Sequence, residues 1–199
     1  MNTREVVLAS RNAKKLAEMQ ALLAPLGLRV RLVSEFCDQT PEESAPTFVE
    51  NALLKARHAA RASGLMAIAD DSGLEVAALR GAPGVHSARY GGVHGDDAAN
   101  NRKLLQALDG RPESERAARF VCALACLRHA DDPVPMIALG LWHGRVLEAP
   151  RGTNGFGYDP LFWVPDQNRS AAELDPAVKN RISHRARAFA SLLAQLREM

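Results

Sequence analysis

The sequence predicts an α/β fold with a mixed sheet, because segments typical of strands and of helices interleave along the chain without strict alternation. The chain opens with a short apolar segment, a polar turn, a helix-like segment and a second strand-like segment. A long amphipathic segment ends it. At 199 residues, the chain has the length of one domain with a substantial core, and we expect residues 1–199 to form a single domain.

The expected strands are apolar or alternating segments bounded by turns, and they cover residues 5–10, 29–34, 66–69, 117–129 and 134–145. The last two form a hairpin. The expected helices start near Ala13, at Asp96 and in the C-terminal segment. A further helix is expected to start at the N-cap Thr47, where Glu50 completes a capping box. Glycine and proline mark long loops at 81–95 and 151–159. The apolar face of the last helix consists of Ile182, Ala186, Phe189, Leu193 and Leu196.

Charge, cysteine content and hydrophobicity restrict the classes of protein to which the chain can belong. The formal net charge is only +2, so any anion must be bound by a local cluster of basic groups, and stable binding to nucleic acid is not expected. Three cysteines without framework spacing, Cys37, Cys122 and Cys126, favour a reducing cytoplasm over a secreted disulfide scaffold. The apolar run at residues 6–9 is too short for a signal peptide or a membrane span, so we expect no membrane partner.

The turn Ser10-x-Asn12-x-x-Lys15 follows the first expected strand and opens a helix. Backbone N–H groups and the helix dipole converge at such a point and favour an anion. Ser10 and Asn12 add side-chain donors, and Lys15 adds a full charge. Taken alone, the segment is more typical of an ordinary capped helix with a solvated lysine, because it lacks a Walker-type glycine loop.

The pair Asp70-Asp71, followed by Ser72-Gly73, comes directly after the strand expected at residues 66–69. We expect the pair at the end of that strand, where sites tend to form in α/β proteins. Adjacent carboxylates are unfavourable unless a cation offsets them, and Mg2+ prefers oxygen ligands. Successive side chains on a strand point to opposite faces, so only one of the two is expected to reach the site. A polar strand end without a metal is the alternative.

Two further segments add charge. Glu42-Glu43 lies in an acidic loop, and Lys55 lies on an otherwise alanine-rich helix, where a lysine needs solvent or an anion. Near the C-terminus, Lys179 and the pair His184-Arg185 are expected at the start of the last helix, where cations oppose the helix dipole and an anion or electron-rich ligand would offset them.

The loop at residues 155–159 carries Phe156 and Tyr158 between glycines, followed by Asp159. An aromatic side chain in such a loop can stack on a flat ring, which contributes about 1–3 kcal/mol per base. The carboxylate can accept hydrogen bonds from a base edge. A hydrophobic turn is the alternative.

In this order, the segments resemble the inosine triphosphate pyrophosphatase family over nearly the whole chain. The segments that carry the resemblance are Ser10-x-Asn12-x-x-Lys15, Thr47-Phe48-Val49-Glu50-Asn51-Ala52 with Lys55, Ala69-Asp70-Asp71-Ser72-Gly73-Leu74, Gly81-Ala82-Pro83-Gly84-Val85 with Ser87-Ala88-Arg89-Tyr90, Gly155-Phe156-Gly157-Tyr158-Asp159-Pro160, and Lys179-Asn180 with Ser183-His184-Arg185. The resemblance implies a two-lobed α/β fold with an elongated mixed sheet flanked by helices, an active-site cleft between the lobes, and a homodimer.

The resemblance also implies hydrolysis of the non-standard purine nucleoside triphosphates ITP, dITP and XTP to the monophosphate and pyrophosphate, which clears them from the nucleotide pool. By position, Asp71 is the catalytic residue and a Mg2+ ligand, with Glu43 as the second metal ligand. The residues implied in substrate binding are Ser10, Arg11, Asn12, Ala13, Lys14, Lys15, Lys55, Ser72, Phe156, Gly157, Tyr158, Asp159, Lys179, His184 and Arg185.

Within that family, base selection has a chemical explanation. Hypoxanthine and xanthine carry a 6-oxo acceptor where adenine carries an amino donor, and Lys179 and Arg185 are donors that cannot accept. Buried donors left without an acceptor reject an analogue strongly.

One position departs from the family pattern, since Ala45 stands where the family often has glycine, two residues after Glu43. A left-handed backbone there would make the alanine costly and would shift Glu43.

Three alternatives remain at the level of sequence. A related enzyme could act on pyrimidine or methylated nucleotides, a metal-dependent phosphatase could use Asp70-Asp71, and the basic C-terminal helix could bind nucleic acid. The residues alone also leave open whether water attacks the α- or the γ-phosphate, and the α-phosphate comes from the resemblance.

Overall fold

The structure is a computed structural model that describes residues 4–10, 16, 19–21 and 23–198. The helix expected to start near Ala13 falls partly outside these residues. Among the described residues of this segment, Met19 and Leu23 are buried and helical, and Leu16 is helical and half-buried.

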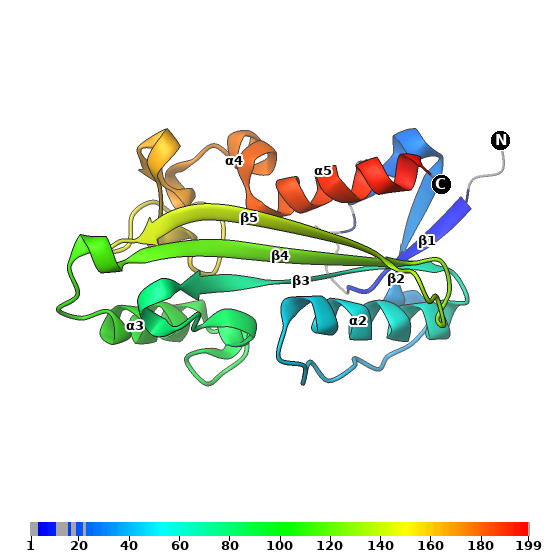
Figure 1. The fold of residues 1–199 in the computed structure, drawn as a ribbon, viewed down its shortest axis with the longest axis horizontal. Coiled ribbons are helices and arrows are strands. Elements are labelled where there is room, and N and C mark those ends of the chain that lie inside the picture. The colour runs from blue at the N-terminus through cyan, green and yellow to red at the C-terminus, as the bar shows by residue number, and fades with distance from the viewer. Residues whose placement is uncertain (1–3, 11–15, 17–18, 22, 199) are drawn as a thin grey trace. The chain divides into compact units, whose positions relative to one another are not determined.

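In the described part of the chain, seven strands form one open sheet in the order β2-β1-β3-β4-β5-β6-β7 (Figure 1). The strands are β1 (Arg4–Leu8), β2 (Leu28–Leu32), β3 (Met66–Val76), β4 (Ala117–Leu127), β5 (Met136–Val146), β6 (Phe162–Val164) and β7 (Arg169–Ser170). β1 pairs in parallel with both β2 and β3, whereas β6 is antiparallel to β5 and to β7. The mixed sheet predicted from the sequence is therefore confirmed.

The helices of at least seven residues that the structure delimits are α2 (Phe48–Ser63), α3 (Asp97–Ala107), α4 (Pro176–Ile182) and α5 (His184–Arg197). The start of α2 follows the predicted cap, because the Thr47 side chain accepts a hydrogen bond from the Glu50 N–H. The helix ends at Gly64, whose φ of 69° suits a residue without a side chain.

The C-terminal helix differs from the prediction in two respects. Ser183 adopts an extended conformation and separates α4 from α5. The buried face of α5 is also rotated from the expected one, since Ala188, Leu192 and Leu196 are buried while Phe189 is only half-buried. Spacings of three and four occur on several faces of this alanine-rich segment, so periodicity alone did not identify the packed face.

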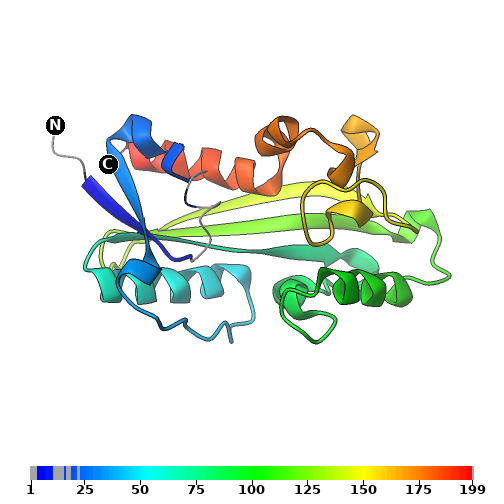
Figure 2. The ribbon, with the colours of Figure 1, turned by 180° about the vertical axis from the view of Figure 1, so that it is seen from behind.

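By its contacts, the chain divides into two compact units. Unit 1 comprises Met1–Asp71, Ala123–Leu139 and Ala188–Met199, and unit 2 comprises Ser72–Cys122 and Gly140–Arg187. Within unit 1, α2 and the unit 1 part of α5 lie on opposite sides of the strands (Figure 1, Figure 2). Within unit 2, α3 and α4 likewise lie on opposite sides of the strands.

Unit 2 has a core rich in aromatic side chains. Phe120, Trp142 and Phe162 contact one another, with ring centroids 4.6–6.3 Å apart. Leu104 of α3 and Leu108, which directly follows the helix, are fully buried in the same core.

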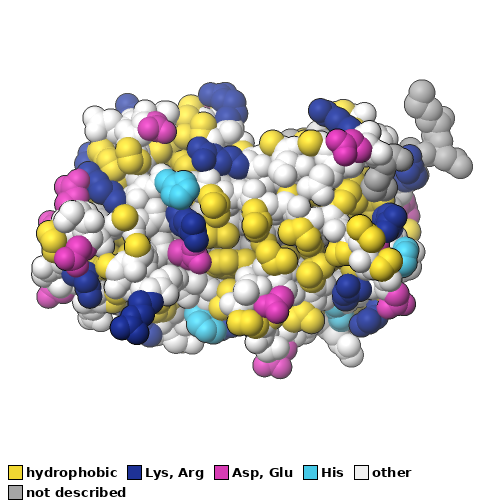
Figure 3. Space-filling model, in the orientation of Figure 1, with side chains coloured by type: hydrophobic (Ala, Val, Ile, Leu, Met, Phe, Trp, Pro, Cys, Tyr) yellow, Lys and Arg dark blue, Asp and Glu magenta, His cyan; other side chains and the backbone are white. Residues whose placement is uncertain are grey.

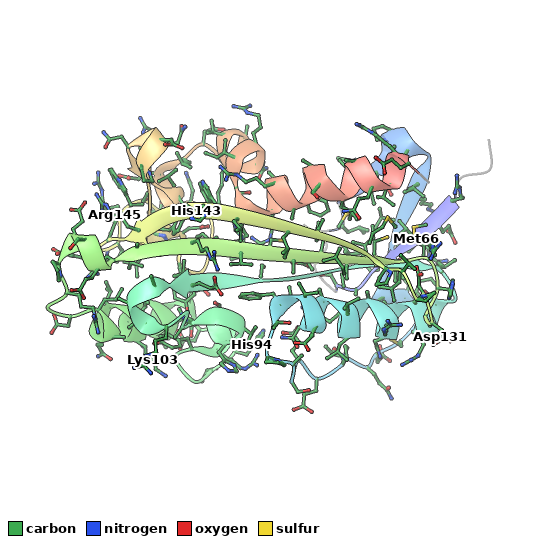
Figure 4. All side chains as sticks on the ribbon, in the orientation of Figure 1. Met66, His94, Lys103, Asp131, His143 and Arg145 are labelled. Carbon is green, nitrogen blue, oxygen red and sulfur yellow. The ribbon has the colours of Figure 1, made fainter. Side chains whose placement is uncertain are left out.

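The connection between β4 and β5 is stabilised by one buried carboxylate. Asp132 accepts hydrogen bonds from the Arg128 backbone N–H, from the Arg128 guanidinium and from the Val134 N–H. Its neighbour Asp131 is exposed, and Figure 4 shows it at this end of the strands. The two strands are neighbours in the sheet, as the predicted hairpin requires.

On the face shown in Figure 3, acidic, basic and apolar side chains are interspersed, which agrees with the small net charge. Among the described residues, no helix combines the length and the apolar character needed to cross a membrane.

Candidate functional site

The acidic pair lies inside a strand. β3 continues from Met66 through Asp70 and Asp71 to Val76, so the prediction that the pair ends the strand is wrong. The β-strand conformation continues because Leu74 and Val76 resume the buried pattern of the core. The alternation of the two carboxylates does follow from the strand geometry, since Asp71 is 8% exposed and Asp70 is half-buried.

Lys55 connects Asp71 with the acidic loop. Its Nζ donates to Asp71 Oδ1 at 2.9 Å and to Glu43 Oε1 at 3.0 Å. Lys55 is placed there by α2, and Asp71 by β3. The three charged groups predicted from separate segments therefore form one cluster in unit 1, with an ammonium between two carboxylates.

Burial and charge act against each other in this cluster. Burial raises the pKa of the Asp71 carboxyl above its ordinary value, and the positive charge and hydrogen bond of Lys55 only partly offset this effect. Burial would lower the pKa of Lys55, but the charge and hydrogen bond of Asp71, together with the charges of Asp70 and Glu43, outweigh it, so the pKa of Lys55 is raised. The second carboxylate oxygen, Asp71 Oδ2, is buried and accepts no hydrogen bond from a described residue.

Asn51 is a residue whose role the sequence did not reveal. It is fully buried on α2, accepts a hydrogen bond from the Ala45 N–H at 3.0 Å and donates to the Ala45 carbonyl oxygen at 3.3 Å. It also hydrogen-bonds to Asp71 and thereby opposes the rise of the Asp71 pKa. The signal available in the sequence was an asparagine on an alanine-rich helix. Such a helix face is expected to be buried, and buried polar groups require partners.

The departure from the family pattern at Ala45 has no backbone cost. Ala45 is not among the described non-glycine residues with positive φ, which are Arg80 and Asn168. Asn51 holds both backbone polar groups of Ala45, and this anchor lies two residues from Glu43. The alanine is therefore compatible with the observed position of Glu43 beside Lys55.

The first predicted anion site is described only in part. Ser10 follows β1, is half-buried, and its N–H donates to the Leu8 carbonyl oxygen at 2.8 Å. The other residues predicted there, Arg11, Asn12, Ala13, Lys14 and Lys15, lie outside the described residues.

A second cluster, in unit 2, surrounds Phe156. This side chain is 62% exposed, which is unusual for a phenylalanine. Lys179 Nζ lies 5.5 Å from the centre of the ring and the Arg185 guanidinium carbon lies 5.2 Å from it. Both distances are within the range of cation–π attraction.

Arg185 is oriented from β3. Its Nη2 donates to Ser72 Oγ at 2.9 Å, while its Nε–H is buried and has no acceptor among the described residues. Ser72 is half-buried and follows Asp71 directly in the chain.

Asp159 is a buried partner of Lys179. Its Oδ2 accepts hydrogen bonds from Lys179 Nζ and, at 2.9 Å, from the Phe156 N–H. Gly155 makes this arrangement possible, because a Cβ there would lie 2.1 Å from Asp159 Oδ2 and the φ of 79° disfavours other residues. The expectation that the carboxylate binds a base edge stays a prediction, and in the structure it orients Lys179.

Two residues predicted to bind substrate have their side chains in the core of unit 2. The Tyr158 ring is buried and its hydroxyl donates to the Ser87 carbonyl oxygen at 2.8 Å. The His184 ring is buried and stacks on Phe120 with centroids 4.8 Å apart. Their contact with substrate stays a prediction. The contacts described for the two side chains stabilise the core of unit 2.

The expectation that Lys179 lies at the start of the last helix, where the helix dipole opposes a cation, is wrong. This residue lies in the last turn of α4, where the dipole favours cations. Its position is explained by Asp159, and only His184 and Arg185 begin a helix.

The fold is shared with a solved structure. A HAM1 protein from Coxiella burnetii superimposes with a TM-score of 0.94 at 51% identity, covering 98% of this chain and all of that one. Proteins of this class combine an open mixed sheet with flanking helices, as described above.

The family follows from the sequence match. The model of the Ham1 family matches residues 6–195, and the chain belongs to this family. It is 58% identical over 196 residues to the dITP/XTP pyrophosphatase of Pseudomonas syringae pv. tomato, covering 98% of each protein. It is also 58% identical over 192 residues to the dITP/XTP pyrophosphatase of Pseudomonas aeruginosa, covering 96% of each. The resemblance inferred from the short motifs is thus confirmed.

Proposed function

We propose that the chain hydrolyses dITP, XTP and ITP to the monophosphate and pyrophosphate, and so removes non-standard purine triphosphates from the nucleotide pool. The observation that carries the proposal is the cluster of Asp71, Lys55 and Glu43, in a chain whose full-length relatives are dITP/XTP pyrophosphatases. A buried carboxylate beside a lysine can orient water while the ammonium attracts phosphate oxygens.

The cofactor of the proposed reaction is Mg2+, held by Asp71 and Glu43. The donor set fits this ion, because Asp71 Oδ2 is a buried carboxylate oxygen without a hydrogen bond from a described residue. No group of three or more acidic, histidine or cysteine side chains in the described part of the chain forms a complete metal site. Mg2+ commonly uses one or two carboxylates together with substrate phosphates. When bound, the ion would neutralise charge on the phosphates.

The chain's own groups divide the remaining work. Lys55 attracts the triphosphate, together with Ser10 and the residues from Arg11 to Lys15. Asp71 orients the attacking water and accepts its proton. Since phosphoryl transfer requires mostly positioning and electrostatic stabilisation, these few charged groups suffice for the chemistry.

The base is recognised by the cluster in unit 2. The exposed ring of Phe156 offers a stacking surface, and Lys179 and Arg185 supply donors beside it. The buried Nε–H of Arg185 needs an acceptor, which a 6-oxo purine has and adenine lacks at that position. The expected consequence is strong rejection of ATP.

A homodimer in the cytoplasm is proposed as the state in which the chain works. Its three cysteines are free thiols, which suits a reducing compartment. Analytical ultracentrifugation at micromolar concentration tests the dimer, and a sedimenting monomer would contradict it.

The test of the reaction is a substrate panel with Mg2+, comparing dITP, ITP, XTP, GTP and ATP, with the products separated by chromatography. We expect monophosphate and pyrophosphate from dITP, ITP and XTP, and almost no turnover of ATP. Release of inorganic phosphate from the start, or equal rates for all bases, would contradict the proposal. Preference for pyrimidine or methylated nucleotides would point to the related enzyme class.

A further inference from the structure

Gly157, in the loop that carries Phe156, is held by α3 through both of its backbone polar groups. The Gly157 N–H donates to Asp97 Oδ2 at 2.6 Å, and Asn101 Nδ2 donates to the Gly157 carbonyl oxygen at 2.9 Å. Asp97 and Asn101 lie four residues apart and so share one face of the helix. All of these residues belong to unit 2.

The position of the Phe156 ring depends on such anchors. The ring is 62% exposed, so packing of the ring itself contributes little to its placement. On its N-terminal side, the Phe156 N–H is bound by the Asp159 carboxylate. On its C-terminal side, the next residue is Gly157, whose φ of 61° is one that glycine adopts without strain. The two bonds from α3 therefore fix the flexible side of the loop.

The stability of α3 alone does not explain why Asp97 contacts Gly157. The N-cap of this helix is Asp96, whose side chain accepts a hydrogen bond from the Ala99 N–H at 2.9 Å. A carboxylate in the first turn is favourable to the helix dipole, but it needs no partner in another segment. The bond from the Gly157 N–H is short and involves an ionised acceptor, which makes it stronger than a bond between neutral groups.

We propose that Asp97 and Asn101 are positioning residues that hold the Phe156 ring where it stacks on the purine. This inference rests on the proposed function, since it assigns to α3 the support of the base-binding loop. Neither residue belongs to the cluster of Asp71, Lys55 and Glu43, so their loss weakens binding of the base and leaves the chemical step intact.

The first experiment compares Asp97→Ala and Asn101→Ala with Asp96→Ala, using dITP as substrate. Asp96→Ala is the matched control, because it removes the cap of the same helix and leaves the bonds to Gly157 in place. We expect KM to rise about five- to tenfold in the first two variants, a part of the stacking contribution, with kcat changed less than about twofold. Asp97→Asn keeps an acceptor oxygen and is expected to restore most of the loss.

A double-mutant comparison shows whether Asp97 acts through the ring. Phe156→Ala is expected to raise KM by about 10- to 100-fold. If Asp97 acts by positioning Phe156, then adding Asp97→Ala to Phe156→Ala changes KM no further. The same factor in both backgrounds, or an equal rise in Asp96→Ala, would overturn the inference.

Binding of inosine monophosphate, measured by calorimetry on the same proteins, separates this inference from the proposed reaction. Weaker binding in Asp97→Ala but not in Asp96→Ala supports the positioning role, even if dITP is not hydrolysed and the proposed reaction fails. Unchanged dissociation constants and unchanged KM in Asp97→Ala would overturn the positioning role, even if dITP is hydrolysed. No binding and no hydrolysis by the unsubstituted protein would overturn both.

Discussion

At the scale of single residues, Asp71 and Asp70 are adjacent carboxylates with different surroundings. Asp71 is buried beside Lys55, whereas Asp70 is half-buried on the other face of β3. We expect Asp71→Asn to lower kcat for dITP by about 10²- to 10⁴-fold, the usual contribution of a group that transfers a proton. Asp70→Asn is the matched control and should lose less than about tenfold. Comparable losses in both variants would contradict the assignment of catalysis to Asp71.

Lys55 is also a structural cation, because it lies between two carboxylates. Its side chain is 11% exposed and that of Asp71 is 10% exposed. Removing one partner of a buried pair leaves an uncompensated charge, so we expect Lys55→Met to lower the free energy of unfolding by about 3 kcal/mol. Urea unfolding at pH 7 measures this change.

Two further variants show whether charge is the cause of that loss. Adding Asp71→Asn to Lys55→Met should recover part of the stability, because it removes the unpaired charge. Lys103→Met is the control. Lys103 is an exposed residue of α3 (Figure 4), and its ammonium lies 4.6 Å from the centre of the Tyr90 ring. It should cost less than about 1 kcal/mol. No recovery in the double variant would indicate lost packing instead of lost charge.

At the scale of elements, the connection between β4 and β5 depends on Asp132. The hydrogen bond from the Arg128 side chain holds the pKa of the Asp132 carboxyl well below its usual range, and backbone N–H groups of Arg128 and Val134 add to the shift against the effect of burial. Because the folded-state pKa is depressed, the stabilisation is complete above the pKa of about 3.9 in an unfolded chain. It is lost as the pH falls below that value toward the folded-state pKa.

We therefore expect Asp132→Asn to lower the free energy of unfolding by about 2 kcal/mol at pH 7. The difference from the unsubstituted protein should shrink as the pH falls below about 4. Asp131→Asn is the control at the neighbouring position, where the side chain is 87% exposed, and it should cost less than about 0.5 kcal/mol. Urea titrations between pH 2.5 and pH 7 follow both variants. A constant difference across this range would contradict the role of the Asp132 charge.

Elements were predictable from the sequence where local chemistry decides them. Thr47 and Glu50 predicted the start of α2, because caps are local. The length of β3 was not predictable, since Asp70 and Asp71 look like a strand end until Lys55 and Asn51 are known to lie beside them. Tertiary contacts stabilise charged residues in the strand, and they are not visible in a local pattern.

At the scale of the whole molecule, the motifs predicted the family and most charged members of both clusters. They did not predict which partners each residue has. Phe156 and Tyr158 look alike in the sequence, yet one ring is exposed and the other is buried in the core of unit 2. Asp159 was expected to accept hydrogen bonds from a base edge, and its pairing with Lys179 was not foreseen. Such distinctions arise from long-range packing, whereas the short motifs record only which residue types are present.

The bond that is cleaved is the last property that we predict. Asp71, the proposed catalytic residue, is followed in β3 by Ser72, which binds Arg185 of the base cluster. Successive side chains of a strand point to opposite faces, so this adjacency in the chain does not determine which phosphorus the water attacks. The proposed products, a monophosphate and pyrophosphate, require attack on the α- or the β-phosphorus, and we expect attack on the α-phosphorus, as the family resemblance implies.

Hydrolysis of dITP in ¹⁸O-labelled water tests this expectation directly. Attack on the α-phosphorus places the label in the monophosphate and leaves the pyrophosphate unlabelled, as mass spectrometry of the separated products would record. Label in pyrophosphate would mean attack on the β-phosphorus, and labelled inorganic phosphate with a nucleoside diphosphate would mean attack on the γ-phosphorus. Either result would leave nucleotide binding in place but would contradict attack of the water on the α-phosphorus.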